Sequence, residues 1–345
     1  LNTRLENVIF HNKIGSQADR VSGIRKISVG IATLLKTDPQ LCDQAAELCK
    51  TDLTTKVVSE FPELQGIVGG LYSKREGHSE AIYTAVANHY QPITQNDKVP
   101  KEMVSTVVAI ADRIFTLTSF WEIGEKPSGS KDPFALRRSA IGLIRILIEN
   151  QLNLQLINLI GKTLSFEKAL DLSQFLGERF RIHLIEKGFK HDTLQACLAN
   201  KTFDDPYTCY QQVEQLEEFR ETKLFSQLMD TYRRPNNILT SEENKNKKKY
   251  DQKPEVKLFN TNEEKTIFEE LQTTEQVVKK MVSENDYRPA LKALADLHRS
   301  VDTFFENVTI NSQDVAQKEN RLFLCNKVRN IMHLVARFSE LKVVL

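Results

Sequence analysis

Cysteine, glycine, proline and tryptophan are all scarce in this sequence of 345 residues, which holds 5, 13, 10 and 1 of them. The cysteines are odd in number and show no Cys-x-x-Cys spacing, so we interpret them as scattered buried thiols of a reducing compartment. No apolar run approaches the roughly 20 residues that span a membrane, and no signal peptide is visible. We therefore expect a cytoplasmic protein with no membrane partner.

An excess of charge of one sign is also missing. Lysine and arginine number 47 against 46 aspartates and glutamates, a formal net charge of +1. Global charge therefore does not argue for nucleic acid, and any such binding must come from local patches. The length allows two or three domains with a sizeable core. The first residue is Leu1, so we expect a piece of a longer protein.

What the sequence does have is helical periodicity almost throughout. Apolar residues recur every three or four positions, for example over residues 24–35 and 104–115. Strand-type alternation is hard to find. The pattern predicts an all-α, multi-domain helical protein.

Two composition changes suggest domain boundaries. Residues 233–254 are polar and weakly basic and contain Pro235, which predicts a solvated loop. A softer boundary follows Asn153, before helices expected over residues 166–186 and 192–199. We therefore expect three domains, over residues 1–153, 154–244 and 245–345.

The segment Lys126–Arg138 reads KPSGSKDPFALRR and leads into an apolar helix predicted over residues 139–152. Asp132 followed by Pro133 is typical of a helix N-cap with proline at the first helical position. Arg137 and Arg138 then lie in the first turns, where the helix dipole favours carboxylates. They predict an anionic partner, either an internal carboxylate such as Glu63 or Asp112 or an external phosphate.

The first 153 residues resemble HD-domain phosphohydrolases, in which imidazole and carboxylate ligands hold a divalent metal. The corresponding residues are His11, expected to open a helix, then Asp52 and Asp112. Where that family needs a His-Asp pair, the chain has Lys50-Thr51-Asp52, and an ammonium cannot ligate a metal. We expect a degenerate HD-like domain without metal, in which Asp112 pairs with Arg113 or Lys50. The alternative is a metal-dependent phosphohydrolase that uses His11, Asp52 and Asp112.

A more specific resemblance rests on long motifs in order along the chain. They are Lys50–Gly66, with EFPELQG at its end, then Ala111-Asp112-Arg113, and then Lys126–Arg138. Further matches lie at Val301–Val308 and Asn320–Leu322. In these segments the sequence resembles the β subunits of bacterial heterotetrameric glycyl-tRNA synthetase, with a DALR-type anticodon-binding bundle in its last domain. Ser128 departs from the family, which has threonine there.

The resemblance implies a subunit of a ligase that itself holds no catalytic residue. In that family the α subunit carries the class II site, which uses ATP and Mg²⁺ to attach glycine to tRNA-Gly. The β subunit supplies tRNA binding and completes an α₂β₂ tetramer. The sequence has no glycine-rich phosphate loop and no class II signature, which agrees with this division. The implied partners are tRNA-Gly and the α subunit, not DNA, and this chain is expected to bind no cofactor.

Basic residues near the end of the chain are the candidates for anticodon binding. Residues 321–342 hold five basic residues and one acid, and we expect them on one long helix. Lysine, arginine and amide side chains suit RNA, because cations hold phosphates and amides read exposed bases. The residues predicted to face the anticodon arm are Arg321, Lys327, Asn330 and Arg337. Those predicted for acceptor-side or interdomain contacts are Lys50, Lys131, Arg137 and Arg138.

Two alternatives to RNA contact remain for these basic residues. They can form an ordinary solvated helix face, or they can pair internally in a purely structural assembly module. Phe304 and Phe305 are interpreted as core packing, because adjacent helical residues point about 100° apart and cannot serve one surface. Trp121, just before the Lys126 turn, is interpreted as a packing anchor for that turn.

Overall fold

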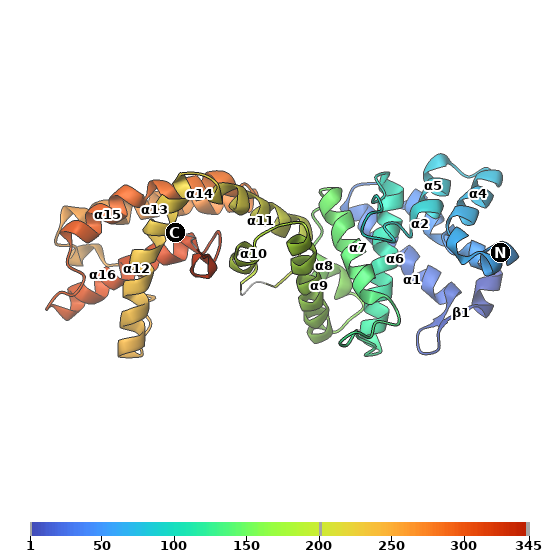
Figure 1. Cartoon of the computed structure of the whole chain (residues 1–345), viewed down its shortest axis with the longest axis horizontal. Coiled ribbons are helices and arrows are strands. Elements are labelled where there is room, and N and C mark those ends of the chain that lie inside the picture. The colour runs from blue at the N-terminus through green and yellow to red at the C-terminus, as the bar shows by residue number, and fades with distance from the viewer. Residues whose placement is uncertain (1, 200–201, 343–345) are drawn as a thin grey trace. The chain divides into compact units, whose positions relative to one another are not determined.

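The computed structural model describes residues 2–199 and 202–342, and its regular structure is almost entirely helical. In this part of the chain the exceptions are two short antiparallel strands, β1 (Ile9–His11) and β2 (Gly15–Ser16), and a bridge between Ser128 and Lys131. Figure 1 shows β1 close to the N-terminus. The predicted all-α class is confirmed.

Two compact units divide the chain, and we call them unit 1 (Leu1–His183 with Thr202–Tyr207) and unit 2 (Leu184–Lys201 with Thr208–Leu345). Unit 1 contains the α-helices α1 (Gln17–Leu34), α2 (Pro39–Leu48), α3 (Lys56–Glu60), α4 (Ile67–Arg75), α5 (Glu80–Asn88), α6 (Met103–Glu122), α7 (Leu136–Glu149), α8 (Leu156–Ile160) and most of α9 (Phe166–Glu186). Unit 2 contains α10 (His191–Leu198), most of α11 (Pro206–Arg220), α12 (Leu224–Asn246), α13 (Asn262–Ser283), α14 (Tyr287–Asp296), α15 (His298–Asn307) and α16 (Val315–Met332). Short 3-10 helices lie at η1 (Asn2–Asn7), η2 (Thr51–Thr54), η3 (Pro62–Leu64), η4 (Val256–Leu258) and η5 (Phe338–Glu340). The expected division into three domains stays a prediction.

Helix α6 forms the centre of unit 1. It packs against α1, α2, α5 and α7, and its residues from Val104 to Ile114 are buried without interruption. It is also the one helix within the described ranges that is long and apolar enough to cross a membrane. The sequence expectation on apolar runs was therefore wrong for α6 by length and composition. Within the protein, 78% of its most apolar window is buried, as in a core helix.

The polar segment predicted as a loop over residues 233–254 is helical in its first part. Helix α12 continues through Pro235 to Asn246, and the loop begins at residue 247. The prediction was wrong because the polar residues of α12 have partners in unit 2. Glu242 pairs with Lys318 at 2.7 Å and Glu243 pairs with Arg329 at 3.0 Å, so a hydrophilic composition here stabilises packing.

The turn before α7 also differs from its prediction. The helix begins at Leu136 rather than at Pro133 or residue 139, and its N-cap is Ala135, in the left-handed region at φ 53°. Asp132 still caps the helix from outside, because its carboxylate accepts hydrogen bonds from the backbone N–H groups of Leu136 (2.8 Å) and Arg137 (3.0 Å). The capping function was predicted correctly, whereas its position was wrong by three residues.

Other expectations from the sequence are confirmed. Helix α9 covers residues 166–186 and α10 differs from its predicted range by one residue at each end. Phe304 and Phe305 are buried. Trp121 is buried as well, and its indole N–H donates to Asp171, the carboxylate that also pairs with Lys126. The tryptophan thus anchors the turn that comes after it. Four of the five cysteines, Cys42, Cys49, Cys197 and Cys325, are buried.

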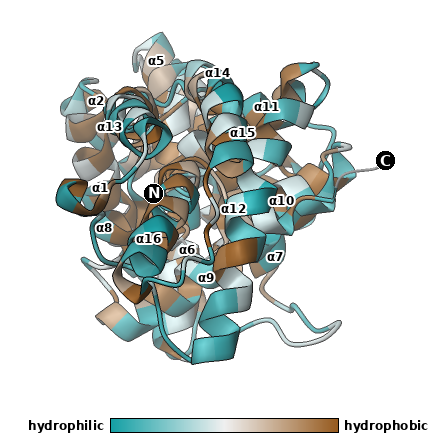
Figure 2. Cartoon of the chain, turned by 90° about the vertical axis from the view of Figure 1, so that its left-hand side faces the viewer, coloured by the Kyte–Doolittle hydropathy of each residue, from teal (hydrophilic) through white to brown (hydrophobic). Residues whose placement is uncertain are grey.

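Unit 2 is a bundle in which α12, α13, α14 and α16 pack against one another. Figure 2 shows hydrophilic residues prominent on the side of α16 that faces the viewer. The helix ends at Met332, so the expectation of one helix over residues 321–342 was wrong. Arg337 lies beyond it, just before η5, and its backbone N–H donates to the carbonyl of Ala196 on α10.

Candidate functional sites

A buried centre of charge lies in unit 1, where α2, α5 and α6 pack together. Lys50 follows α2 and its fully buried ammonium lies 3.0 Å from Oδ2 of Asp112 on α6. The same nitrogen lies 2.9 Å from Nε2 of His89, which follows α5, and 3.7 Å from the centre of the Tyr90 ring. An ammonium has three N–H donors, and each has a partner here.

The contacts of His89 fix its tautomer. Because the Lys50 ammonium can only donate, Nε2 of His89 accepts, and Nδ1–H donates to the carbonyl of Val86 at 2.7 Å. Burial and the charge of Lys50 hold the pKa of His89 well below its usual value, so the imidazole is neutral. Burial also lowers the pKa of Lys50 to about 8, which leaves the ammonium charged at neutral pH.

Asp112 has a second cationic partner that the sequence did not suggest. Its Oδ1 accepts from Nε (3.2 Å) and Nη2 (2.8 Å) of Arg20 on α1. Burial disfavours ionisation of Asp112, but Arg20 and Lys50 outweigh burial and hold its pKa well below the usual range. Two cations face one carboxylate, so the centre as a whole is positive.

Arg113 does not pair with Asp112, although the two are adjacent in sequence. Neighbouring residues on a helix point about 100° apart, and the Arg113 guanidinium instead donates to four backbone carbonyls. These belong to His89, Tyr90, Pro92 and Ala109. Of the two pairings expected for Asp112, the one with Lys50 is confirmed and the one with Arg113 is wrong.

The residues at the metal-ligand positions of an HD domain are not brought together. His11 lies on β1 rather than on a helix, and its ring packs edge-on against Phe120 and Phe134. Asp52 turns away from the centre, because its Oδ2 accepts from the N–H groups of Gly66 and Gly69 at the start of α4. Within residues 2–199 and 202–342, no group of three or more His, Cys, Asp and Glu side chains could hold a metal ion.

Asp52 connects the two ends of the motif Lys50–Gly66. Gly66 has a positive φ of 83°, and a Cβ placed there would lie 3.0 Å from the carbonyl oxygen of Ala87. Glycine is required at this position for both reasons. Within the motif, Asp52 therefore holds the N-terminus of α4 through two backbone N–H groups.

The four cations of the Lys126–Arg138 segment have different surroundings, and Lys126 pairs with Asp171 as described above. The Arg137 guanidinium donates to the carbonyl of Gly129 at 2.7 Å and so closes the turn itself. Lys131 and Arg138 are exposed, and neither side chain has a hydrogen-bond or ion-pair partner in the described part of the chain. The internal carboxylates considered for the arginines, Glu63 and Asp112, pair with neither Arg137 nor Arg138.

Most of the basic residues expected to form one exposed face in unit 2 are bonded to other side chains of the protein. Arg321 is buried, with its guanidinium 2.7 Å from Glu264, so its predicted place on the surface is wrong. Arg329 pairs with Glu243 as described above. Arg337 donates to Nδ1 of His333 at 2.7 Å. The reason is that α13 and α12 present carboxylates to α16, which the sequence of α16 alone does not show.

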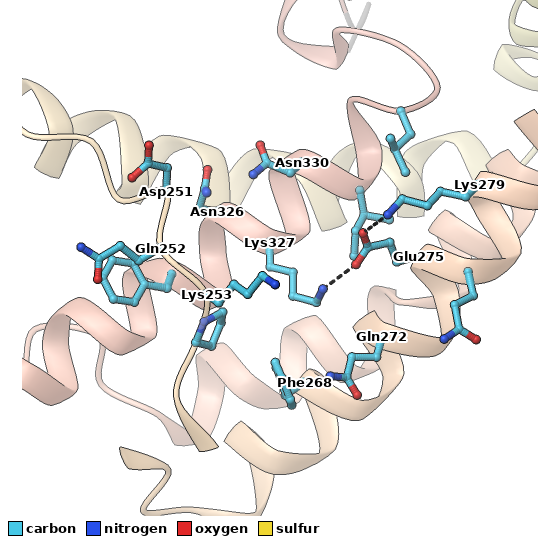
Figure 3. A pocket seen from close by; sticks show the side chains of 15 residues that line it. Asp251, Gln252, Lys253, Phe268, Gln272, Glu275, Lys279, Asn326, Lys327 and Asn330 are labelled. Carbon is cyan, nitrogen blue, oxygen red and sulfur yellow. Dashed lines mark hydrogen bonds and ion pairs between the residues drawn. The ribbon is translucent and has the colours of Figure 1, made fainter. Parts of the chain in front are cut away.

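Lys327 and Asn330 do lie on a surface feature. They line a groove of about 720 Å³ between α13, α16 and residues 251–254 (Figure 3). Lys327 and Lys279 both point toward Glu275, at 2.6 Å and 2.5 Å from its two carboxylate oxygens (Figure 3). Glu275 thus holds two ammonium groups side by side, and Asn330 is exposed beside them.

The sequence did not identify several residues of this groove, because they come from α13 and from the loop before it. Besides the lysines and Asn330, its lining includes Lys253, Phe268, Gln272, Gln276 and Asn326. On α13, residues 268, 272, 275, 276 and 279 recur at helical spacing, a signal available in the sequence. The groove combines cations, amides and an aromatic ring, the three kinds of side chain that contact phosphates and unpaired bases.

Comparison with known proteins gives one family match in the first part of the chain and another in the last part. The profile of the family described as "Glycyl-tRNA synthetase beta subunit" matches residues 1–199, and that of the "DALR anticodon binding domain" matches residues 228–342. Among curated relatives, the glycine–tRNA ligase beta subunit of Cereibacter sphaeroides is 37% identical over 349 residues, covering 98% of this chain and 50% of the relative. That of Dinoroseobacter shibae is 38% identical, covering 94% and 50%. The chain spans about half the length of the curated relatives it matches.

Proposed function

The chain belongs to the family of glycyl-tRNA synthetase beta subunits, and on that premise we propose that it is the tRNA-binding half of such a subunit. In this proposal it binds tRNA-Gly while an α subunit attaches glycine, and the two kinds of subunit assemble as α₂β₂ in the cytoplasm. ATP and Mg²⁺ act on the α subunit, and this chain holds no cofactor or metal of its own.

The observation that carries the proposal is the groove of unit 2. Its ammonium groups are held in place by one shared carboxylate, which leaves the Lys279–Glu275–Lys327 group positive by one charge. A phosphate that approaches this group meets donors that are already positioned, so little side-chain entropy is lost on binding. The exposed amides of Gln272 and Asn330 beside it offer hydrogen bonds to base edges.

The positions of the predicted residues reduce the number that we propose to contact tRNA. Lys327 and Asn330 remain as anticodon-side contacts, joined by Lys279 and Lys253. Arg321 is left out because its guanidinium is used within the protein. In unit 1, Lys131 and Arg138 remain available for acceptor-side contacts, whereas Lys50 is buried and Arg137 holds its own turn.

The test is the affinity of this chain for tRNA-Gly and for an unrelated tRNA over a range of salt concentrations. Lys279→Gln should weaken binding and lower the slope of log K against log salt by about 1, the value for one lost phosphate contact. Lys280→Gln is the matched control, because Lys280 is the exposed neighbour on α13 that does not line the groove. Asn330→Ala should lower affinity without changing the slope. Equal effects of the two lysine substitutions would contradict the assignment of the groove.

The many internal ion pairs support a second candidate, a module that serves assembly alone. Arg321, Arg329 and Lys327 all contact carboxylates of unit 2. In that case the chain binds tRNA-Gly no better than an unrelated tRNA, with no dependence on Lys279 or Asn330. The same titrations therefore distinguish the two candidates.

A further inference from the structure

A second hollow lies in unit 1, directly beside the buried Lys50–Asp112 centre. It has a volume of about 220 Å³ and is bounded by α1, α6 and the start of α7. Its lining includes Arg20, Tyr90, Arg113, Phe134, Arg138 and Ser139. Asp112 forms part of its floor.

The charges around this hollow favour an anion. Three guanidinium groups line it, and Asp112, its one carboxylate, is already bonded to Arg20 and to the Lys50 ammonium behind it. His89, next to Lys50, is neutral, and Tyr90 contributes an uncharged ring. The groups that face the hollow from α1, α6 and α7 thus sum to an excess of positive charge.

Some of the polar groups in the hollow have no protein partner. Arg138 is exposed, and in the described ranges its guanidinium makes no hydrogen bond or ion pair. Ser139 beside it likewise has a hydroxyl without a side-chain hydrogen bond among the described residues. Arg20 uses Nε and Nη2 for Asp112, which leaves Nη1 for another acceptor. The N-terminus of α7 does not itself attract an anion, because the Asp132 carboxylate already accepts hydrogen bonds from its first N–H groups.

The rest of the hollow is held rigidly. Arg113 is fixed by four backbone carbonyls, and Phe134 stacks on Phe120 with ring centres 4.2 Å apart. Arg20 lies over the Phe10 ring, 4.4 Å from its centre. These contacts fix the lining of the hollow, and Arg20 in particular is a partly desolvated donor that binds an anion with little reorganisation.

We propose that this hollow binds a phosphoryl group, held by Arg138, Ser139 and the free edge of Arg20. Its volume lies below the roughly 300–1,000 Å³ of pockets that enclose whole small molecules. The phosphate itself is therefore the group that enters, and the remainder of the ligand stays outside, against Phe134 or in solvent. A phosphate of RNA and the phosphate of a free nucleotide share this chemistry. The site is separate from the groove of unit 2, and its occupancy does not depend on that groove.

The experiment is calorimetric titration of the full chain with inorganic phosphate, with AMP, and with a short single-stranded RNA carrying or lacking a 5′-phosphate, all at one ionic strength. We expect Arg138→Gln to weaken binding of the phosphorylated ligands about tenfold or more, the effect of one charge-assisted contact. Arg75→Gln is the matched control, because Arg75 is an exposed arginine of α4 outside the hollow, with no ion pair in the described part of unit 1. It should leave binding unchanged.

Comparison of the titrated ligands shows which kind of molecule carries the bound phosphate. Equal affinity for AMP and phosphorylated RNA identifies the phosphate alone as the ligand, and preference for RNA identifies a nucleic-acid end or backbone. Ser139→Ala, a change that removes one hydroxyl, should weaken binding less than Arg138→Gln does. Absence of binding in all arms, or equal losses for Arg138→Gln and Arg75→Gln, would overturn the proposal. Losses caused by Lys279→Gln in unit 2 concern the groove and leave this inference unaffected.

Discussion

The ammonium of Lys50 lies 3.0 Å from Oδ2 of Asp112, fully buried, with Arg20 on the other oxygen of the same carboxylate. One negative charge therefore holds two positive ones inside unit 1. Removal of the carboxylate would leave both cations buried and facing each other, whereas removal of Lys50 would leave a matched pair. The stability of unit 1 thus depends more on Asp112 than on either cation.

Asp112→Asn should accordingly lower the free energy of unfolding by about 3–5 kcal/mol, the cost of breaking a buried ion pair from one side. Lys50→Met should cost less, about 1–3 kcal/mol, because Asp112 keeps Arg20 and the main loss is the donor to His89. Urea unfolding of both variants measures the difference. Equal losses, or a larger loss for Lys50→Met, would show that the two cations do not share Asp112 as described.

Treatment with a metal chelator should leave the stability of the protein unchanged. The Lys50 ammonium occupies the space between His89 and Asp112, and a cation without a lone pair repels a metal. We expect elemental analysis of the purified chain to find no stoichiometric divalent metal. Melting temperature should be the same before and after treatment with a chelator. A bound metal that is lost together with stability would instead support the phosphohydrolase alternative.

Arg321→Ala should destabilise unit 2 rather than weaken tRNA binding selectively. Glu264 is 1% exposed, and loss of its partner leaves a buried carboxylate unpaired, at a cost of about 3 kcal/mol. Glu264→Gln in the same chain should recover part of that loss, because glutamine keeps the capping interaction with Thr261 and carries no charge. A double-mutant cycle by urea unfolding measures the coupling. Where the variant is folded, its affinity for tRNA-Gly should equal that of the parent.

The pH dependence of unit 2 should contain a contribution from His333. Arg337 donates to its Nδ1 and Tyr232 lies 3.0 Å from its Nε2, an arrangement that requires the neutral ring. Burial, followed by the charges of Arg337 and Arg329, lowers the pKa of His333 to about 4. The unfolded histidine, with a pKa of about 6.5, binds the proton more tightly than the folded one. Stability from this group is therefore complete above pH 6.5 and is lost as the pH falls toward 4.

The measurement for His333 is the urea midpoint at pH 5 and pH 7. His333→Gln should show a smaller change between these two values than the parent chain, because glutamine does not titrate. Carboxylates contribute to both proteins alike, so the difference between them isolates the histidine. An identical change in parent and variant would mean that the pKa of His333 is the same in the folded and the unfolded chain, and would contradict the prediction.

Asp132→Ala should lower stability by about 1 kcal/mol, the usual cost of losing a side chain that caps a helix. Asp132→Asn should cost a few tenths, because the amide oxygen can still accept from Leu136. Lys131→Ala is the control within the same turn, since the Lys131 side chain is exposed and has no partner in the described residues. Thermal unfolding monitored by circular dichroism compares the three. A loss for Lys131→Ala as large as that for Asp132→Ala would indicate that the turn as a whole, rather than the cap, is being disturbed.

Much of the fold could be predicted because it follows from local pattern. The apolar spacing over residues 104–115 is sufficient to place α6, and the spacing over residues 166–186 places α9. The polar stretch at residues 233–246 could not be read in the same way. Its helix depends on Lys318 and Arg329, more than 70 residues away in the chain, and composition alone carries no information about such partners.

Periodicity and motifs in the amino-acid sequence are enough to give the all-α class and the family, and to mark Lys50, Asp112 and Arg138 as residues with unusual surroundings. Which of the charged side chains are free of partners depends instead on how the helices pack. This packing places Arg321 against Glu264 and Arg20 against Asp112, and it leaves Arg138, Lys131 and Asn330 at the surface. The physical reason is that a charge is available to a ligand when no opposite charge lies within a few ångströms, and that distance is set by packing between helices.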